Sequence, residues 1–336
     1  MKKNVTIKDV AKQAGVSIST VSRVINDSKP VTDEVKQRVR EVIKETGYVP
    51  NPLARSLVTR KSMLIGVVVP EMADPFVSEI LTGIEEVAKM YDYDILLSNT
   101  YMDKDQEEKS INLLKAKQVE GIIMLTWEVS KESVDLIENS GIPAIYISKT
   151  AGEYDVNTVS TNNKEATKEM TDYLVKTGHS RIGFVMTSND YTVLEHERLT
   201  GYKEALEVNG IDFDDSLVSS GSTDYESGYR AAMELLGKID KPDALFVTGD
   251  EAAIGAVNAC FDSGLRVPED ISVAGFNDIR YAKMFRPSLT TVHQPLYDIG
   301  AVAVRMIIKI INGERDFEKR VKLPHEIIER NSVIKR

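Results

Sequence analysis

The segment from Thr6 to Asn26 constrains the fold most, because it predicts two short helices joined by a tight turn. Thr6 can cap the first helix, with Asp9 in its first turn, and Gly15 can adopt the left-handed conformation that ends it. Ser17 can cap the second helix. This helix-turn-helix geometry places a helix in the DNA major groove, although an ordinary helical hairpin has the same outline.

The side chains of this segment divide into two groups on the predicted helices. The apolar residues expected to pack one helix on the other are Val10, Val16, Val21 and Val24. The residues left on the outer face of the second helix are Ile18, Ser19, Ser22 and Arg23. The outer face therefore carries the side chains that could reach a nucleic acid.

The charge of the chain is unevenly distributed. Residues 1–62 contain 13 Lys and Arg and 6 Asp and Glu, a balance of +7, whereas the remainder carries −17. The net charge of −10 therefore hides a small basic module in front of a large acidic body. Attraction to phosphates should draw the basic module to DNA and turn the acidic body away from it.

A third helix and a short fourth one are predicted to complete the basic module. Residues 32–44 carry an apolar stripe, with Thr32 as the expected cap and Gly47 as the expected end. Residues 51–57 offer a further short helix with Asn51 as its cap. Such a short helix is marginal in water and needs a partner helix or DNA, and a plain linker explains the same residues.

From Lys61 onward, short apolar runs alternate with amphipathic helical patterns. The predicted strands are residues 64–69, 94–97, 121–125 and 144–147 and, after about residue 160, residues 182–186, 244–247 and 271–275. Short apolar runs between helices indicate parallel sheets that are covered on both faces. Two such series predict two doubly wound α/β lobes, with ligands in the crevice at the strand C-termini.

Both the basic module and the body resemble one known protein family. Residues 5–61 resemble the DNA-binding headpiece and hinge of the lactose-repressor (LacI/GalR) family of bacterial regulators, and the matching segments are residues 6–11, 15–17, 20–26, 47–51 and 54–57. The body resembles the periplasmic-binding-protein-like core of that family, and the matching segments are residues 201–202, 249–251, 264–268 and 289–295. The resemblance implies a homodimeric transcription regulator, mainly a repressor, on a pseudo-palindromic DNA operator.

The resemblance also implies how DNA is read. Ile18, Ser19 and Arg23 would contact base edges in the major groove, where an arginine fork suits guanine. Leu57 and its dimer mate would wedge into the minor groove and unstack a base step. The residues expected at the DNA interface are Thr6, Ser17, Ile18, Ser19, Thr20, Ser22, Arg23, Asn26, Asn51, Ala54, Arg55 and Leu57.

By the same resemblance the two lobes interleave, because the chain crosses between them near residues 161, 290 and 320. We therefore expect a headpiece at residues 1–50, a hinge helix and linker at 51–61, an N-terminal lobe at 62–160 plus about 293–320, and a C-terminal lobe at 161–292 plus about 321–336.

No motif predicts catalysis. The sequence contains no phosphate-binding glycine loop or nucleophile elbow at a strand–helix junction, and its four histidines lack ligand spacing. We therefore expect no enzyme, no metal and no cofactor, and a solute-binding protein or an enzyme on the same body is a remote alternative.

The single Cys260 excludes an internal disulfide, and without a signal peptide or membrane span we expect a cytoplasmic protein with no membrane partner.

A cleft between the lobes is the first candidate effector site. Sugar- and purine-sensing relatives grip their ligands there with an arginine, an asparagine and an aspartate. Arg198 matches the arginine, but Asn277 stands in place of the aspartate and Gly249 in place of the asparagine, which argues against a tight sugar site of the usual kind. The residues expected to line the crevice are Phe76, Thr161, Arg198, Asn277 and Asp278, and packing or capping roles explain several of them equally well.

Residues 294–309 point to a second candidate effector. Arg305 and Lys309 lie four residues apart, on one helix face, and such a cation pair suits a phosphate, although exposed basic pairs more often serve solvation alone. This segment resembles family members that control carbon catabolism, whose co-repressor is the phosphocarrier HPr phosphorylated on serine. The residues expected at that contact are Glu86, Tyr91, Tyr297, Asp298, Arg305 and Lys309. The alternative effector is a small sugar or sugar phosphate in the cleft.

Overall fold

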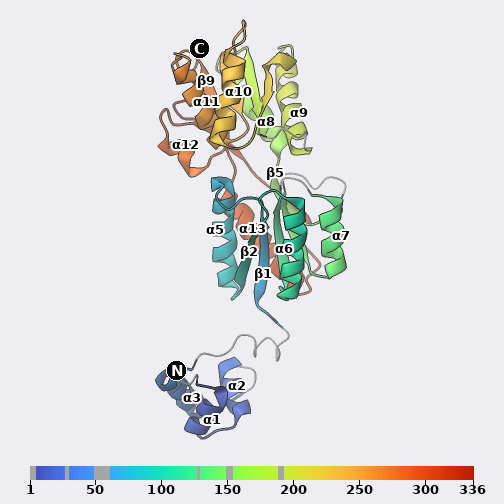
Figure 1. Cartoon of the computed structure of the whole chain (residues 1–336), viewed down its shortest axis with the longest axis vertical. Helices are drawn as coiled ribbons and strands as arrows, with labels where there is room; N and C mark the ends of the chain where they lie inside the picture. The colour runs from blue at the N-terminus through green and yellow to red at the C-terminus, as the bar shows by residue number, and fades with distance from the viewer. Residues whose placement is uncertain (1–4, 27–29, 49–60, 127–128, 149–153, 188–192) are drawn as a thin grey trace. The chain divides into compact units, whose positions relative to one another are not determined.

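The computed structural model describes residues 5–26, 30–48, 61–126, 129–148, 154–187 and 193–336. The chain divides into two compact units, a headpiece up to Met63 and a body from Leu64 to Arg336 (Figure 1). No helix in these ranges is long and apolar enough to cross a membrane.

The described part of the headpiece contains three helices around one small core. They are α1 (Ile7–Ala14), α2 (Ile18–Asn26) and α3 (Asp33–Thr46). The buried residues of the core are Val10, Ala11, Ala14, Val21, Val24, Val39 and Val42, and Val16 packs against them while partly buried. The predicted packing of the first two helices is therefore confirmed.

Local sequence explains where the headpiece helices begin and end. Gly15 has φ of +64°, the left-handed conformation predicted for the end of α1. Gly47 ends α3 as predicted and also has φ of +64°. The backbone N–H of Thr20 donates to Oγ of Ser17 at 3.1 Å, so Ser17 caps α2 as predicted. Thr32 is the N-cap residue of α3 as predicted, but within the described residues its side chain makes no capping hydrogen bond.

Within its described residues, the body contains two sheets of six strands each. The first sheet has the order β11-β5-β4-β3-β1-β2, and every neighbouring pair is parallel. Its strands are β1 (Leu64–Val69), β2 (Asp94–Asn99), β3 (Gly121–Thr126), β4 (Ala144–Ser148), β5 (Thr158–Thr161) and β11 (Arg320–Leu323). Helices α5 (Pro75–Met90) and α13 (Leu296–Ile311) cover one face, and α6 (Lys104–Ala116) and α7 (Lys131–Ser140) cover the other (Figure 1).

The second sheet has the order β12-β10-β9-β8-β6-β7. Its strands are β6 (Ile182–Met186), β7 (Val218–Ser220), β8 (Ala244–Val247), β9 (Ser272–Asn277), β10 (Thr290–His293) and β12 (Glu326–Ile328). Helices α8 (Asn163–Lys176) and α9 (Val193–Val208) cover one face, and α10 (Tyr225–Leu236) and α11 (Asp250–Asp262) the other, with the short α12 (Arg280–Met284) beside α11. Strand β12 runs antiparallel to β10, so the prediction of a wholly parallel sheet is corrected at this edge.

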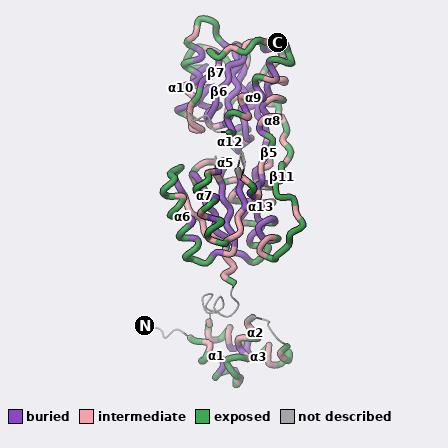
Figure 2. The backbone as a smooth tube through the Cα atoms, turned by 90° about the vertical axis from the view of Figure 1, so that its right-hand side faces the viewer, coloured by how far each residue is buried: buried purple, intermediate pink, exposed green. Residues whose placement is uncertain are grey.

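Buried residues follow the strands and the inward faces of the helices in both lobes (Figure 2). Separate apolar clusters lie under the two helical layers of the second lobe. Parallel strands buried on both faces account for the short uninterrupted apolar runs in the sequence.

The chain passes between the sheets three times, each time through a short connection. It leaves the first sheet after Thr161, returns between His293 and Leu296, and leaves again between Leu323 and Glu326. Thr161 and residues 321–323 thus belong to the first sheet, although we expected them in the second lobe, because β11 pairs with β5 along residues 320–323.

Candidate DNA interface, interlobe cleft and co-repressor surface

The outer face of α2 carries the predicted DNA-reading residues. Val21 and Val24 are buried in the headpiece core, which turns the opposite side of the helix outward. On that side Ile18 is 44 % exposed, and Ser19 and Arg23 are exposed as well. The exposed face therefore combines an arginine fork, a hydroxyl and an apolar side chain, the groups that contact base edges and thymine methyls.

Hydroxyl groups gather at the first turn of α2. Oγ of Ser17 lies 2.7 Å from Oγ of Ser19 and 2.8 Å from Oγ1 of Thr20. At the start of α1, the carboxylate of Asp9 accepts from the backbone N–H of Thr6 at 2.9 Å and from its hydroxyl at 2.7 Å. Helix N-termini that carry hydroxyls suit phosphate oxygens.

The other residues predicted to contact DNA do not all lie on the exposed face of α2. Ser22 is half-buried on α2, and Asn26 is the last residue of that helix. The predictions for Asn51, Ala54, Arg55 and Leu57 lie outside the described residues.

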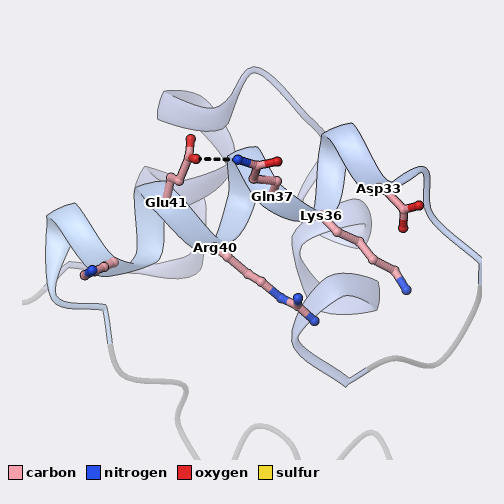
Figure 3. Close-up of a pocket in the computed structure, with 6 residues that line it drawn as sticks. Asp33, Lys36, Gln37, Arg40 and Glu41 are labelled. Carbon is pink, nitrogen blue, oxygen red and sulfur yellow. Dashed lines mark hydrogen bonds between the residues drawn. The ribbon is translucent and has the colours of Figure 1, made fainter.

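A shallow hollow on the outer surface of α3 is not one of the predicted sites. It is lined by Asp33, Lys36, Gln37, Arg40, Glu41 and Lys44. Figure 3 shows Lys36 and Arg40 extending to the same side of the helix, away from Gln37 and Glu41, whose side chains form a 3.0 Å hydrogen bond. Because opposite charges alternate along this exposed helix, the hollow is a solvated helix face.

Arg198 lies fully buried on α9, beside strand ends of the second sheet. Its Nη1 donates to Oε1 of Glu195 at 3.2 Å and to the carbonyl oxygen of Thr248 at 3.0 Å, and its guanidinium stacks 4.4 Å from the ring centre of Phe276. Burial lowers the pKa of Arg198, and Glu195 opposes this effect. Nε and Nη2 of Arg198 have no hydrogen-bond partner among the described residues.

Phe76 and Thr161 share a small cavity on the first lobe. Its volume is about 20 Å³, and its wall also includes Asn163 and Gln294. Such a volume holds about one water molecule, so the cavity is closed to a sugar in this conformation. Arg198, Asn277 and Asp278 do not line this cavity, so the five predicted cleft residues are not brought to one pocket.

Asn277 and Asp278 follow each other in unusual backbone conformations at the end of β9, with φ of +109° and +59°. The amide of Gln294 donates to Oδ1 of Asn277 at 2.7 Å. Asp278 accepts from Arg330 at 2.6 Å and lies 3.1 Å from Nδ1 of His293. Asn277 and Asp278 therefore connect the end of β9 to neighbouring segments of the chain. The carboxylate of Asp278 already has Arg330 and His293 as partners.

Asp250 is a buried carboxylate that the sequence did not identify as a site residue. It accepts from the backbone N–H of Ile279 at 2.8 Å and from Oγ1 of Thr291 at 2.6 Å. Burial raises its pKa to about 7, with the two hydrogen bonds opposing the effect. Asp250 thus joins the start of α11 to Ile279, which follows β9, and to Thr291 of β10.

The predicted co-repressor residues are divided between α5 and α13, which pack closely. A Cβ added to Gly83 of α5 would lie 2.0 Å from the carbonyl oxygen of Tyr297, and one added to Gly300 of α13 would lie 2.2 Å from that of Ile80. Only glycine permits this approach of the two backbones. The hydroxyl of Tyr297 donates to Oε2 of Glu86 at 2.8 Å across the same contact.

The outward face of this helix pair is charged along α13 and apolar at the end of α5. Asp298, Arg305 and Lys309 are exposed along α13. Tyr91 is 44 % exposed, and the neighbouring Met90, which sequence reasoning missed, is 73 % exposed. The sequence could have indicated an exposed Met90, because this residue stands beside Tyr91 at the end of an amphipathic helix.

The described ranges contain no group of three or more His, Cys, Asp or Glu side chains that could hold a metal ion. Cys260 is buried, which raises the pKa of its thiol to about 12.

Comparison with known proteins matches both units. Residues 6–51 match the family model for bacterial regulatory proteins of the lacI family, and residues 62–331 match the model for periplasmic binding proteins and the sugar binding domain of the LacI family. Catabolite control protein A of Priestia megaterium is 38 % identical over 330 residues, which cover 98 % of this chain and 99 % of that protein.

Two solved structures resemble the whole chain. The lac repressor dimer bound to operator and the anti-inducer ONPF has a TM-score of 0.90 at 27 % identity, covering 99 % of this chain and 100 % of the repressor chain. The complex of the transcriptional regulator CelR with cellobiose has a TM-score of 0.76 at 32 % identity, covering 98 % of this chain and 99 % of the CelR chain.

Proposed function

The chain belongs to the LacI family of DNA-binding transcriptional regulators, and from this premise we propose that it is a homodimeric, mainly repressing regulator of carbon-catabolic genes in the cytoplasm. Its co-repressor in this proposal is the phosphocarrier HPr phosphorylated on serine. The relatives named above are regulators of transcription, and no catalytic role is proposed.

The exposed face of α2 supports the DNA-binding part of the proposal. Arg23 and Ile18 project from a helix whose opposite side is fixed in the headpiece core, so the reading face is held rigidly. The lac repressor, which the chain resembles over its whole length, is bound to operator as a dimer. We assign the major-groove contacts to Ile18, Ser19 and Arg23, and the minor-groove wedge to Leu57.

The surface formed by α5 and α13 supports the co-repressor part of the proposal. Arg305 and Lys309 are exposed on one helix face, where their charges can bind the oxygens of a phosphoserine. Met90 and Tyr91 provide exposed apolar contacts at the end of the neighbouring helix. A phosphate site beside an apolar patch suits a folded protein that carries a phosphoserine, and the 38 % identity to catabolite control protein A supports the same partner.

Binding of the co-repressor would act on DNA affinity through the lobes. A partner that contacts one arrangement of the two lobes better than another shifts the population toward that arrangement. In a dimer this would set the spacing of the two hinges. Operator affinity would thereby follow the phosphorylation state of HPr.

Operator selection tests the whole proposal. Random duplexes are selected with the full chain in the presence and absence of HPr phosphorylated on serine, at one fixed salt concentration. We expect a two-fold symmetric site that is enriched more strongly with the phosphoprotein. Recovery of no preferred duplex would contradict DNA-binding regulation, and equal enrichment in both arms would contradict the co-repressor.

Calorimetry with phosphorylated HPr tests the surface directly. Arg305→Ala should weaken binding at least about tenfold, because a charge-assisted contact to phosphate is lost. Arg266→Ala is the matched control, since this exposed arginine lies in the second lobe, paired with Asp270 at 2.9 Å. Unphosphorylated HPr should bind weakly to both variants and to the parent chain. Equal affinity of the parent chain and Arg305→Ala would exclude this surface.

A small effector in the interlobe cleft is the second candidate. Arg198 supports it, because a fully buried guanidinium with two nitrogens without hydrogen-bond partners among the described residues is a ready anchor for a polar ligand. The regulator CelR, which the chain resembles, is solved with cellobiose. Titration of the full chain with sugars and sugar phosphates distinguishes this effector from HPr.

A further inference from the structure

The three connections between the two lobes lie side by side. Thr161, where the first connection begins, pairs with Leu323, where the third begins. Glu326, where the third connection ends, pairs with His293, where the second begins. The lobes are therefore joined by adjacent strand ends, and a rotation of one lobe against the other would bend all three connections together.

Gln294 lies in the second connection and has neighbours in both lobes. Its side-chain amide donates to Oδ1 of Asn277, at the end of β9 in the second lobe, at 2.7 Å. Its carbonyl oxygen accepts at 2.8 Å from the backbone N–H of Leu296, the first residue of α13. Gln294 also lines the small cavity of the first lobe, together with Phe76 and Thr161. A change in the angle between the lobes would therefore pull Gln294 away from one set of these neighbours.

The hydrogen bond between Gln294 and Asn277 is shielded from water. The two residues are only 4 % and 9 % exposed. Water replaces an exposed hydrogen bond when it breaks, whereas the loss of a buried one leaves a donor and an acceptor unsatisfied. The bond thus favours the angle between the lobes at which it forms over angles at which it breaks.

The acceptor side of this bond has a strained backbone. Asn277 has φ of +109°, well beyond the small left-handed region that residues other than glycine reach, and Asp278 follows with φ of +59°. Such a conformation persists only where the surroundings hold it. Gln294 holds Asn277, while Arg330 at 2.6 Å and Nδ1 of His293 at 3.1 Å hold the carboxylate of Asp278. Release of Gln294 would allow Asn277 to relax, so the segment has two arrangements that differ in this one bond.

We propose that the hydrogen bond between Gln294 and Asn277 is a latch that holds the two lobes at one angle without a small ligand and opens when the lobes rotate. Gln294 is a positioning residue, because it acts through Asn277 and through the start of α13. Helix α13 also carries Arg305 and Lys309, so contact of a partner with these residues would be transmitted to the second lobe through the latch. This link to a partner rests on the proposed co-repressor, whereas the latch itself does not.

Hydrogen–deuterium exchange of the full chain tests the latch without any ligand. Gln294→Met keeps the approximate size of the side chain but removes its amide. Exchange at residues 161–163, 293–296 and 323–326 should become about threefold to tenfold faster than in the parent chain. Asn277→Gly should show a similar increase, since it removes the acceptor and suits the backbone conformation at this position. Denaturant unfolding of the same preparations separates local opening from a general loss of stability.

The double variant of Gln294→Met and Asn277→Gly distinguishes one shared bond from two separate structural roles. If the two side chains act through one bond, the double variant should exchange no faster than the faster single variant. Asn258→Ala is the matched control, because its side-chain amide donates to the hydroxyl of Tyr225 at 2.8 Å within the second lobe. This control should leave exchange at the three connections unchanged.

Two results would overturn the latch. One is exchange at the connections that is as slow in Gln294→Met as in the parent chain, and the other is a double variant in which the two single effects simply add. If Gln294→Met does not fold, the comparison of Asn277→Gly with the parent chain decides in the same way.

Operator binding tests the link between the latch and α13. The parent chain should bind its selected operator more tightly with phosphorylated HPr, and in Gln294→Met this enhancement should shrink at least about threefold. Equal enhancement in both chains would overturn the link. A parent chain that does not respond to phosphorylated HPr would contradict the proposed co-repressor, and faster exchange in Gln294→Met would still support the latch.

Discussion

The hydroxyl of Tyr297 donates a 2.8 Å hydrogen bond to Oε2 of Glu86, although the two residues are 211 positions apart in the sequence. The bond joins the first turn of α13 to the later part of α5, and acceptance by Glu86 raises the pKa of Tyr297. It therefore links the two helices whose exposed residues form the proposed co-repressor surface.

Tyr297→Phe should reduce the affinity for phosphorylated HPr with only a small loss in the free energy of unfolding, because the hydrogen bond that it removes is exposed. Tyr229→Phe is the control, because the hydroxyl of Tyr229 donates to Asp262 at 3.0 Å on the other lobe. Denaturant unfolding should give similar small losses for both variants, and calorimetry should find weaker HPr binding only for Tyr297→Phe. Equal HPr affinity of the two variants would contradict a role for Tyr297.

Gly83→Ala should destabilise the body by about 2–3 kcal/mol, within the range for overpacking, because its Cβ would lie 2.0 Å from a backbone carbonyl that cannot rotate away. Chemical denaturation of the full chain measures the loss. Gly237→Ala is the comparison, since a Cβ there would lie no closer than 3.3 Å to any neighbouring atom. A Gly83→Ala variant as stable as Gly237→Ala would show that α5 and α13 separate easily.

Arg23→Ala should weaken specific operator binding by about 1–3 kcal/mol, the cost of a lost bidentate contact to a base. Its side chain is exposed, so the headpiece should keep its circular dichroism spectrum. Fluorescence anisotropy at one salt concentration should find a much smaller change on a duplex without the operator. An equal loss on both duplexes would assign Arg23 to the phosphate backbone instead.

His179 should make the body less stable in acid. Its ring is buried, with Nε2 2.8 Å from Oγ of Ser272 and Nδ1 3.0 Å from the carbonyl oxygen of Leu174. Burial lowers its pKa in the folded state below the ordinary value of 6.5, so below that pH the unfolded chain binds the proton more readily. The contribution of His179 to stability is therefore complete above pH 6.5 and is lost as the pH falls toward the folded pKa.

Melting temperatures between pH 7.5 and 5 measure this effect. His179→Gln should lower the melting temperature at neutral pH and flatten its decline on acidification. His196→Gln, a change at an exposed histidine, should retain the slope of the parent chain. A His179→Gln variant with an unchanged slope would assign the acid sensitivity to other groups.

Local signals predicted the headpiece and most of the apolar strands. Ser17 and Gly15 act through neighbours in sequence, so their roles could be read directly. Strands β5 and β11 were missed because β5 is rich in Thr and Ser and β11 alternates exposed with half-buried residues, patterns without a continuous apolar run.

The sites were harder to predict than the fold. Arg198 was predicted as a cleft residue, but its three-residue spacing from Glu195 does not reveal that both side chains are buried. The contact of Tyr297 with Glu86 and the cavity shared by Phe76 and Thr161 depend on tertiary packing across the lobe. Asp250 carried only a landmark role in the sequence, since its burial depends on β9 and β10.

The strands β11 and β12 have a consequence for synthesis on the ribosome. Each completes the edge of a different sheet, and both are made after all other strands. Neither lobe can acquire its final edge until this late segment leaves the ribosome, whereas the headpiece is made first and has a core of its own. The nascent chain would therefore contain a folded headpiece before it contains the complete body that is proposed to regulate DNA binding.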